Sequence, residues 1–356
     1  METERMILGI YLEPSVWVCN EGEHPDPELM SPEECTRIVF SKALPNGVEV
    51  CVQRQGFVVV AFPEDLLGIK ISEIRTANLL PIKAAQTALS FFNALLFLVY
   101  DQTYRYYVRN YQSLKQAVDI SGIWRWNDDA TAKLATIAVK QPMPVMRQDK
   151  EFLTETDLYT LLQSIGQLTK NDKVFRFELP SAVVDQALSL LFQMGDVQVN
   201  WQLLALLNKA VYSIQRADFA ESHILSWSVA ENLIETEWKN YILRSNEPVE
   251  TSGEKTVNSE RLKNLVSPDY SAAQRAEILE LAKVIPFELF KRSVSARKAR
   301  NDWLHNLKSV IQNDCRNCYL VARDLLSRKV GFNIEHPGAF YIQDESMPRR
   351  KASNGS

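Results

Sequence analysis

The spacing of hydrophobic and polar positions changes along the chain. Up to about residue 80 the apolar residues come in short β-branched or alternating runs, which is the pattern of strands. Four such runs are M-I-L-G-I-Y-L, T-R-I-V-F, V-E-V-C-V and G-F-V-V-V-A-F. Pro45, Asn46 and Gly47 separate the second run from the third, and Asn-Gly is a strong signal for a hairpin turn. This region is expected to form a small antiparallel sheet.

From about Pro81 the spacing of apolar positions becomes that of helices. The expected helices are Ala84–Tyr100, Tyr104–Val118, Glu151–Leu168 and Ser181–Met194, with a short strand at Phe175–Leu179 between the last two. The first of these is the most apolar run of the chain, but it is slightly short for a membrane span and contains polar side chains. We interpret it as a buried core helix, and no membrane partner is expected.

Two helices in the last third of the chain carry a charged residue within an apolar face. The apolar side of the first consists of Ala220, Ile224, Trp227, Ile234, Trp238 and Ile242. The second is expected to begin near Pro286, and its apolar stripe consists of Trp303, Leu307, Ile311, Cys318, Val321 and Leu325. Glu231 lies inside the first stripe and Arg300 inside the second. Because an unpaired buried charge is costly, the two faces are expected to pack so that these residues pair.

Composition narrows the possible classes of protein. A chain of 356 residues is long enough for two or three domains, and an apolar fraction of 46% is typical of a globular protein. The net charge of -4 argues against a general binder of polyanions. An odd number of cysteines and no signal peptide indicate a reducing cytoplasm. Cys315 and Cys318 have the spacing of half a zinc site that nothing completes, so core packing is expected, with no metal and no cofactor.

The segment R-K-A-R-N-D-W-L-H-N carries the candidate chemistry. Arg300 and His305 lie five residues apart in it, and the polar Asn301 follows the arginine directly. An imidazole moves protons near neutral pH, and a guanidinium holds a phosphate and the charge that builds on it. On a helix, Asn301 and His305 are i,i+4 neighbours, whereas Arg300 lies about 140° around the axis from His305. These groups suffice for cleavage of RNA without a metal.

Residues from about 212 to 328 resemble a HEPN domain, a helical fold found in many ribonucleases. The signature of that family is Arg, a polar residue, three variable residues and His, and R-N-D-W-L-H matches it as it stands. The helix with W-S-V-A-E-N-L-I-E resembles the family's first helix. The resemblance implies a metal-independent endoribonuclease that acts as a homodimer. It further implies that Arg300 and His305 are catalytic, that Asn301 orients His305 and that Glu231 holds Arg300.

Basic residues surround the motif. Arg297 and Lys298 precede it and Lys308 follows it, and these residues are expected to bind RNA phosphates, although a solvated helix face is the ordinary alternative. Two other functions compete with the ribonuclease: a non-catalytic HEPN-like scaffold that binds RNA, nucleotide or protein, and a structural helical protein with a chance motif. Ribonucleases of this family commonly act in toxin or antiphage systems, which adds a regulator or antitoxin as an expected partner.

Together these patterns predict an α+β, mostly helical fold. Its expected parts are a strand-rich N-terminal module (1–80), a helical middle region (81–211), a HEPN-like helical bundle (212–330) and a flexible tail (331–356). Of the four histidines, only His305 is assigned to chemistry. His24 is expected in a loop, His223 in the core and His336 in the tail.

Overall fold

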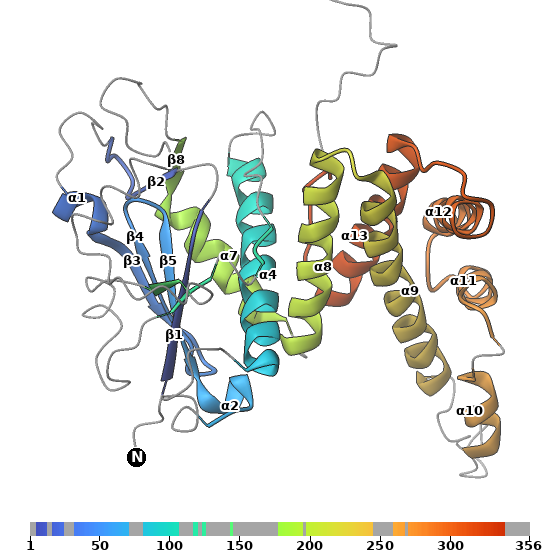
Figure 1. Ribbon diagram of the computed structural model, residues 1–356. Coiled ribbons are helices and arrows are strands. Elements are labelled where there is room, and N and C mark those ends of the chain that lie inside the picture. Colours follow the sequence, from blue (N-terminus) through green and yellow to red (C-terminus); the bar gives the residue numbers. More distant parts are fainter. Residues whose placement is uncertain are drawn as a thin grey trace, which may run out of the picture.

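An antiparallel sheet forms the first part of the computed structural model, and helices follow it, which confirms the expected α+β class (Figure 1). The structure describes residues 5–12, 16–24, 32–70, 81–106, 117–119, 123–125, 143–144, 177–194, 197–244, 259–267 and 270–338. The expected helix Glu151–Leu168 lies outside these residues, as do positions 107–116 of the helix expected at Tyr104–Val118.

The sheet confirms the expected strands. In spatial order it contains β3 (Ile38–Ala43), β4 (Glu49–Gln53), β5 (Phe57–Pro63), β1 (Arg5–Tyr11), β6 (Trp124–Arg125) and β7 (Met143–Pro144). Neighbouring strands pair antiparallel. The strands β3 and β4 form the predicted hairpin, in which Gly47 takes a φ of 80° that a residue without Cβ adopts readily. Two short helices, α1 (Pro32–Thr36) and α2 (Glu64–Leu67), flank these strands in sequence.

Both faces of the central strands β1, β4 and β5 are buried. Side chains alternate between the faces along each strand, and one set, which includes Leu8, Val50 and Val60, belongs to the main core. The other set forms a separate cluster of Ile7, Cys51, Phe57, Val59 and Ala61. Burial on both sides explains why β5 reads as a continuous apolar run instead of an alternating one.

A two-stranded sheet ties the start of the chain to its middle. In it, β2 (Val16–Cys19) pairs in parallel with β8 (Phe177–Pro180), which confirms the strand expected near Phe175–Leu179. The helix α7 (Ser181–Gln193) begins directly after β8, as predicted. It packs against α4 (Ile82–Tyr106).

The helix α4 lies between the sheet and the later helices (Figure 1). Its side chains at positions 91–103 are all buried. The rings of Phe91 and Phe92 meet the ring of Phe62 in β5 edge-on, with centroids 5.1 and 5.9 Å away. By length and composition α4 passes as a membrane span, but most of its apolar window is buried inside the protein. It is the core helix that the sequence predicts.

The later helices lie on the side of α4 away from the sheet (Figure 1). They are α8 (Val197–Gln215), α9 (Phe219–Arg244), α10 (Ser259–Leu265), α11 (Ala272–Leu281), α12 (Phe287–Asn306) and α13 (Gln312–Val330). The helix α8 contacts both α4 and α9, and α9 contacts α11, α12 and α13. One apolar core runs from Met6 to Ile334, and the expected boundary at residue 211 falls inside α8. The regions 81–211 and 212–330 therefore share a core.

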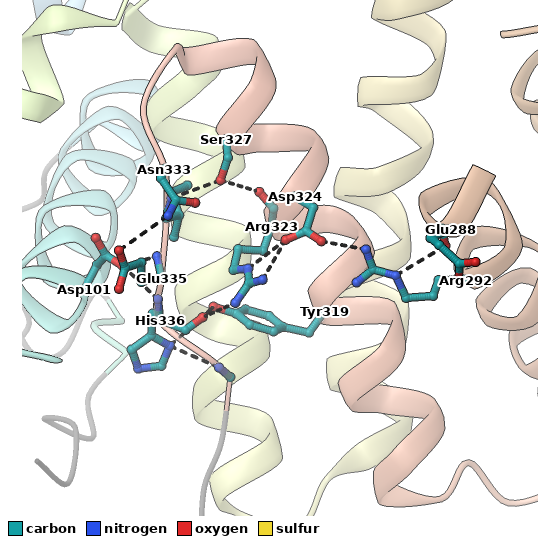
Figure 2. A network of polar contacts seen from close by, with 12 residues as sticks. Asp101, Glu288, Arg292, Tyr319, Arg323, Asp324, Ser327, Asn333, Glu335 and His336 are labelled. Carbon is teal, nitrogen blue, oxygen red and sulfur yellow. Dashed lines mark hydrogen bonds and ion pairs between the residues drawn. The ribbon is translucent and has the colours of Figure 1, made fainter. Parts of the chain in front are cut away.

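The segment after α13 corrects a prediction. The sequence predicts a flexible tail from residue 331, but residues 332–338, which we call the clasp, lie against α13 and α4 (Figure 2). Ile334 is only 1% exposed and His336 is fully buried. The prediction is wrong for 331–338 because the loss of helical spacing says nothing about long-range partners, and the partner here is Asp101 on α4.

Asp101 receives the clasp. Its Oδ1 accepts the backbone N–H groups of Glu335 at 2.6 Å and His336 at 2.8 Å. Its Oδ2 accepts hydrogen bonds from Gln102 at 2.9 Å and from Arg105 Nε at 3.0 Å. Burial raises the pKa of the Asp101 carboxyl, and the charge of Arg105 and the two backbone donors oppose that shift. The carboxylate thus joins α4 to the clasp.

His336 is held from the other side by α13. The hydroxyl of Tyr319 donates to the His336 carbonyl at 3.0 Å, and Arg323 Nη1 donates to the same oxygen at 3.3 Å. Arg323 also binds Asp324 at 2.7 Å, and Asp324 binds Arg292 of α12 at 2.8 Å (Figure 2). A continuous polar network therefore runs from α4 through the clasp and α13 to α12.

Asp101→Asn is expected to lower the free energy of unfolding by about 2–4 kcal/mol. The amide oxygen can keep the two backbone hydrogen bonds, but the amide nitrogen meets the donor groups of Arg105 and Gln102. Denaturant unfolding measures the loss. Asp185→Asn is the matched control, because that carboxylate is half-exposed, pairs with Lys42 and should cost less than about 1 kcal/mol. Equally small losses in both variants would show that Asp101 does not hold the clasp.

His336 should make stability fall as the pH drops. Burial and the charge of Arg323 lower the pKa of His336 to about 3, whereas the imidazole of the unfolded chain takes up a proton near pH 6.5. The penalty is absent well above pH 6.5 and grows by about 1.4 kcal/mol per pH unit below it. His336→Gln, which takes up no proton, should lose unfolding free energy less steeply between about pH 6.5 and 4.5. Identical slopes in urea unfolding would contradict this account.

Candidate functional site

The motif occupies the last turns of α12. Pro286 stands at the N-cap, as predicted, since a proline has no N–H to leave unpaired there. The helix ends at Asn306, and Leu307 takes a left-handed φ of 51°. The N–H of Leu307 donates to the carbonyl of Trp303 at 3.0 Å, which closes the final turn. His305 is therefore the penultimate residue of the helix.

The apolar stripe expected from Trp303 to Leu325 is not continuous, because the chain leaves the helix between α12 and α13. Leu307 is 85% exposed and Ile311 is 58% exposed. The buried part of the stripe consists of Cys318, Val321 and Leu325, all on α13. Helical spacing persists across the break in the sequence, and a left-handed leucine is not a recognisable stop signal, so periodicity alone extends the helix too far.

Arg300 lies on the inner flank of α12 and is half-buried. Its Nη1 donates to Asn301 Oδ1 at 3.1 Å, and its Nε is buried. The guanidinium therefore lies against the neighbouring asparagine. A contact between Arg300 and Asn301 differs from the expectation that Asn301 orients His305 directly.

The predicted partner of Arg300 is wrong. Glu231 is exposed on α9, and within the residues that the structure describes no ion pair joins it to Arg300. The buried side of α9 extends toward Ala230 and Leu233, because α9 packs on α8 and α13 together. Glu231 falls at the edge of that side. The prediction placed it inside the apolar face, and a rotation of the helix by one residue position is enough to cause that error.

Asn301 and His305 are neighbours on α12. The asparagine is half-buried and the histidine is exposed. At i,i+4 spacing their Cβ atoms lie about 6 Å apart. The structure therefore brings Arg300 and Asn301 into contact and leaves His305 one turn further along, open to solvent. The three predicted residues therefore follow one another along the last turns of α12.

The basic residues around the motif differ in their surroundings. Lys308 pairs with Asp302 at 3.2 Å, and Asp302 also accepts from Asn306 at 3.5 Å. Lys298 is exposed and Arg297 is half-buried, and neither takes part in an ion pair among the described residues. Of the three predicted phosphate-binding side chains, Lys298 and Arg297 therefore have no carboxylate in ion-pair distance among the described residues.

The other histidines are placed as the sequence predicts, except His336. His24 is exposed and pairs with Glu178 at 3.1 Å. His223 on α9 is fully buried, and its Nε2 lies 2.9 Å from the carbonyl of Ala296 on α12. The sequence indicates an inward-facing position for His223, but it carries no signal for the helix that this side chain meets.

The cysteines agree with core packing. All five are free and buried. Burial raises the pKa of Cys315 to about 11 and that of Cys318 well above its ordinary value, which keeps both as thiols that bind metals poorly. In the part of the chain that the structure describes, no group of three or more His, Cys, Asp or Glu side chains could hold a metal ion.

Comparison with known proteins gave no match, whether to a family model, to a curated protein or to a solved structure.

Leu307→Gly is expected to raise the free energy of unfolding by about 0.5–1 kcal/mol, because glycine adopts the left-handed conformation without a Cβ penalty. The leucine side chain is largely exposed, so little packing is lost with it. Thermal unfolding of dilute protein measures the gain. Leu304→Gly, three residues earlier and inside the helix, is the control and should cost about 1 kcal/mol. A loss of stability in both variants would contradict the assigned turn.

Proposed function

We propose that the chain is a metal-independent endoribonuclease of the HEPN type that acts as a homodimer. The observation that supports this most directly is the 3.1 Å hydrogen bond between Arg300 Nη1 and Asn301 Oδ1, with His305 exposed one turn further along the same helix. The charged guanidinium thus contacts Asn301, and the imidazole lies one helical turn beyond Asn301 at the surface. The R-N-x3-H order in the sequence is the second support.

In the proposed reaction the 2′-OH of the substrate attacks the adjacent phosphorus. His305 takes or returns the proton, because an imidazole exchanges protons near neutral pH. Arg300 neutralises the charge that develops on the phosphate oxygens, and Asn301 holds the guanidinium in place. The P–O5′ bond breaks, which leaves a 2′,3′-cyclic phosphate on one fragment and a 5′-OH on the other. DNA lacks the attacking hydroxyl and is not a substrate.

The surface of α12 supports a homodimer. Phe287, Val294 and His305 lie on one line along the helix, since their spacings of seven and eleven residues are close to whole turns. Exposed apolar side chains gather on this helix and the connection after it, namely Phe287 (57%), Val294 (40%), Leu304 (41%), Leu307 (85%) and Ile311 (58%). A second copy on this face would cover them and close the space beside His305.

RNA binding would draw on the basic side chains of the same helix. Lys298 is exposed near the line that ends at His305, and Arg297 lies beside it. Both approach the motif from its N-terminal side. The proposed substrate path therefore runs along α12 toward its end, with phosphates near these residues.

The test is cleavage of single-stranded RNA by the purified full chain in the presence of EDTA. His305→Ala should lower the rate by about 10²–10⁴-fold and Arg300→Ala by about 10²–10³-fold. His24→Ala and Arg244→Ala change an exposed histidine and an exposed arginine elsewhere and should cleave as the unmodified chain does. Mass spectrometry of the fragments should find cyclic phosphate ends.

Two results would overturn the proposal. Binding of RNA without cleavage by the unmodified chain would favour the non-catalytic scaffold. Cleavage that survives both substitutions would assign the activity to other residues or to a contaminant. Sedimentation of the unmodified chain beside Val294→Glu tests the dimer, because a charge in the middle of the exposed line should dissociate it.

A further inference from the structure

His223 stands behind the motif in the packed interior. It belongs to α9, is fully buried, and its Nε2 lies 2.9 Å from the carbonyl oxygen of Ala296. A carbonyl can only accept a hydrogen bond, so Nε2 carries the proton and donates. The contact joins α9 to the buried side of α12 in the middle of that helix.

The carbonyl that His223 binds belongs to the turn of Arg300. In an α-helix the carbonyl of residue i accepts the N–H of residue i+4, so the Ala296 oxygen is the acceptor for the backbone N–H of Arg300. That oxygen therefore receives two donors, one from the arginine's own backbone and one from His223. The hydrogen bond from the imidazole thus restrains the backbone turn from which the Arg300 side chain projects.

The surroundings of His223 fit a fixed, neutral ring. Burial lowers the pKa of His223 and the positive charge of Arg300 adds to the shift, whereas the hydrogen bond to the Ala296 carbonyl and the carboxylate and backbone of Asp314 oppose it. The backbone of His223 is braced in turn, since Cys318 Sγ on α13 lies 3.6 Å from its carbonyl oxygen. The residue thus contacts α12 through its side chain and α13 through its backbone.

We propose that His223 is a positioning residue for Arg300: its hydrogen bond to the Ala296 carbonyl sets where the guanidinium stands relative to His305. The inference rests on the proposed ribonuclease function for its catalytic consequence, but not for its structural one. A neutral donor is required at this place. A side chain of similar size without the donor would let the turn of Arg300 shift.

Three variants of the full chain separate positioning from bulk packing. His223→Gln keeps an N–H that can reach the Ala296 carbonyl, whereas His223→Leu fills the space without a donor. In His223→Asn the amide ends nearer the backbone and falls short of that carbonyl, so it replaces the leucine variant should the latter fail to fold. Hydrogen exchange of the peptide that covers 297–306 should speed up in the Leu and Asn variants and return toward the original rate in the Gln variant.

The cleavage assay supplies the second readout. His223→Leu should lower kcat about ten- to hundredfold with little change in KM, and His223→Gln should recover most of it. Combined with Arg300→Ala, His223→Leu should cause no further loss, because the side chain that it positions is already gone. A further loss in that double variant, equal exchange rates in the Gln and Leu variants, or a change confined to KM would overturn the positioning role.

The two proposals fail in different ways. A chain that cuts no RNA but shows the donor-dependent exchange pattern refutes the ribonuclease and keeps the anchoring of α12 by His223. A chain that cuts RNA equally well with leucine, asparagine and glutamine at position 223 keeps the ribonuclease and refutes the positioning residue.

Discussion

The burial of α4 on every side between Phe91 and Thr103 is the constraint to which the rest of the structure conforms. A helix that is apolar around its whole circumference must be covered all round. The sheet covers one side of α4, α7 and α8 cover others, and the clasp closes its C-terminal end (Figure 1). Because α8 also contacts α9, the core that begins in the sheet continues into the helices that carry the motif.

Polar residues determine the rotation of α4 about its axis, which its apolar surface leaves undetermined. A helix with apolar residues on all sides has no preferred rotation, but a buried polar group has a small number of partners. In the middle of the helix, Asn93 exchanges two hydrogen bonds of 2.9 Å with the backbone of Val118 and accepts a third from Asn208 at 2.9 Å. Near the C-terminal end, Asp101 receives the clasp. These two contacts set the rotation and position of the helix.

Local patterns in the sequence predicted local structure well. The hairpin at Gly47, the helix after Pro180 and the core helix that became α4 all follow from residues next to one another in the chain. The pairing of Glu231 with Arg300 failed because it depended on the relative phase of two helices. The tail prediction failed at 331–338 because Asp101, more than two hundred positions away in sequence, decides it.

In the candidate site, too, features set by neighbouring residues were predictable and features set by packing were not. The order of Arg300, Asn301 and His305 on one helix was predictable, since α-helical spacing alone determines it. The end of α12 was not, because Leu307 adopts a conformation that favours glycine. Nor was the contact between His223 and Ala296 predictable, since it needs the packing of α9 on α12.

The polar contacts that hold α12 lie near its start and in its middle, and this bears on the proposed chemistry. Arg292 is tied to Asp324 near the start of the helix, and His223 holds the turn of Arg300 in the middle. His305 lies beyond both, in an exposed final turn. A group that stabilises developing charge must be in place before the reaction, whereas a proton-transferring group often takes its final position only when substrate binds. The held arginine and the open histidine match those two requirements, and the apolar face beside them provides the surface that a second copy would cover.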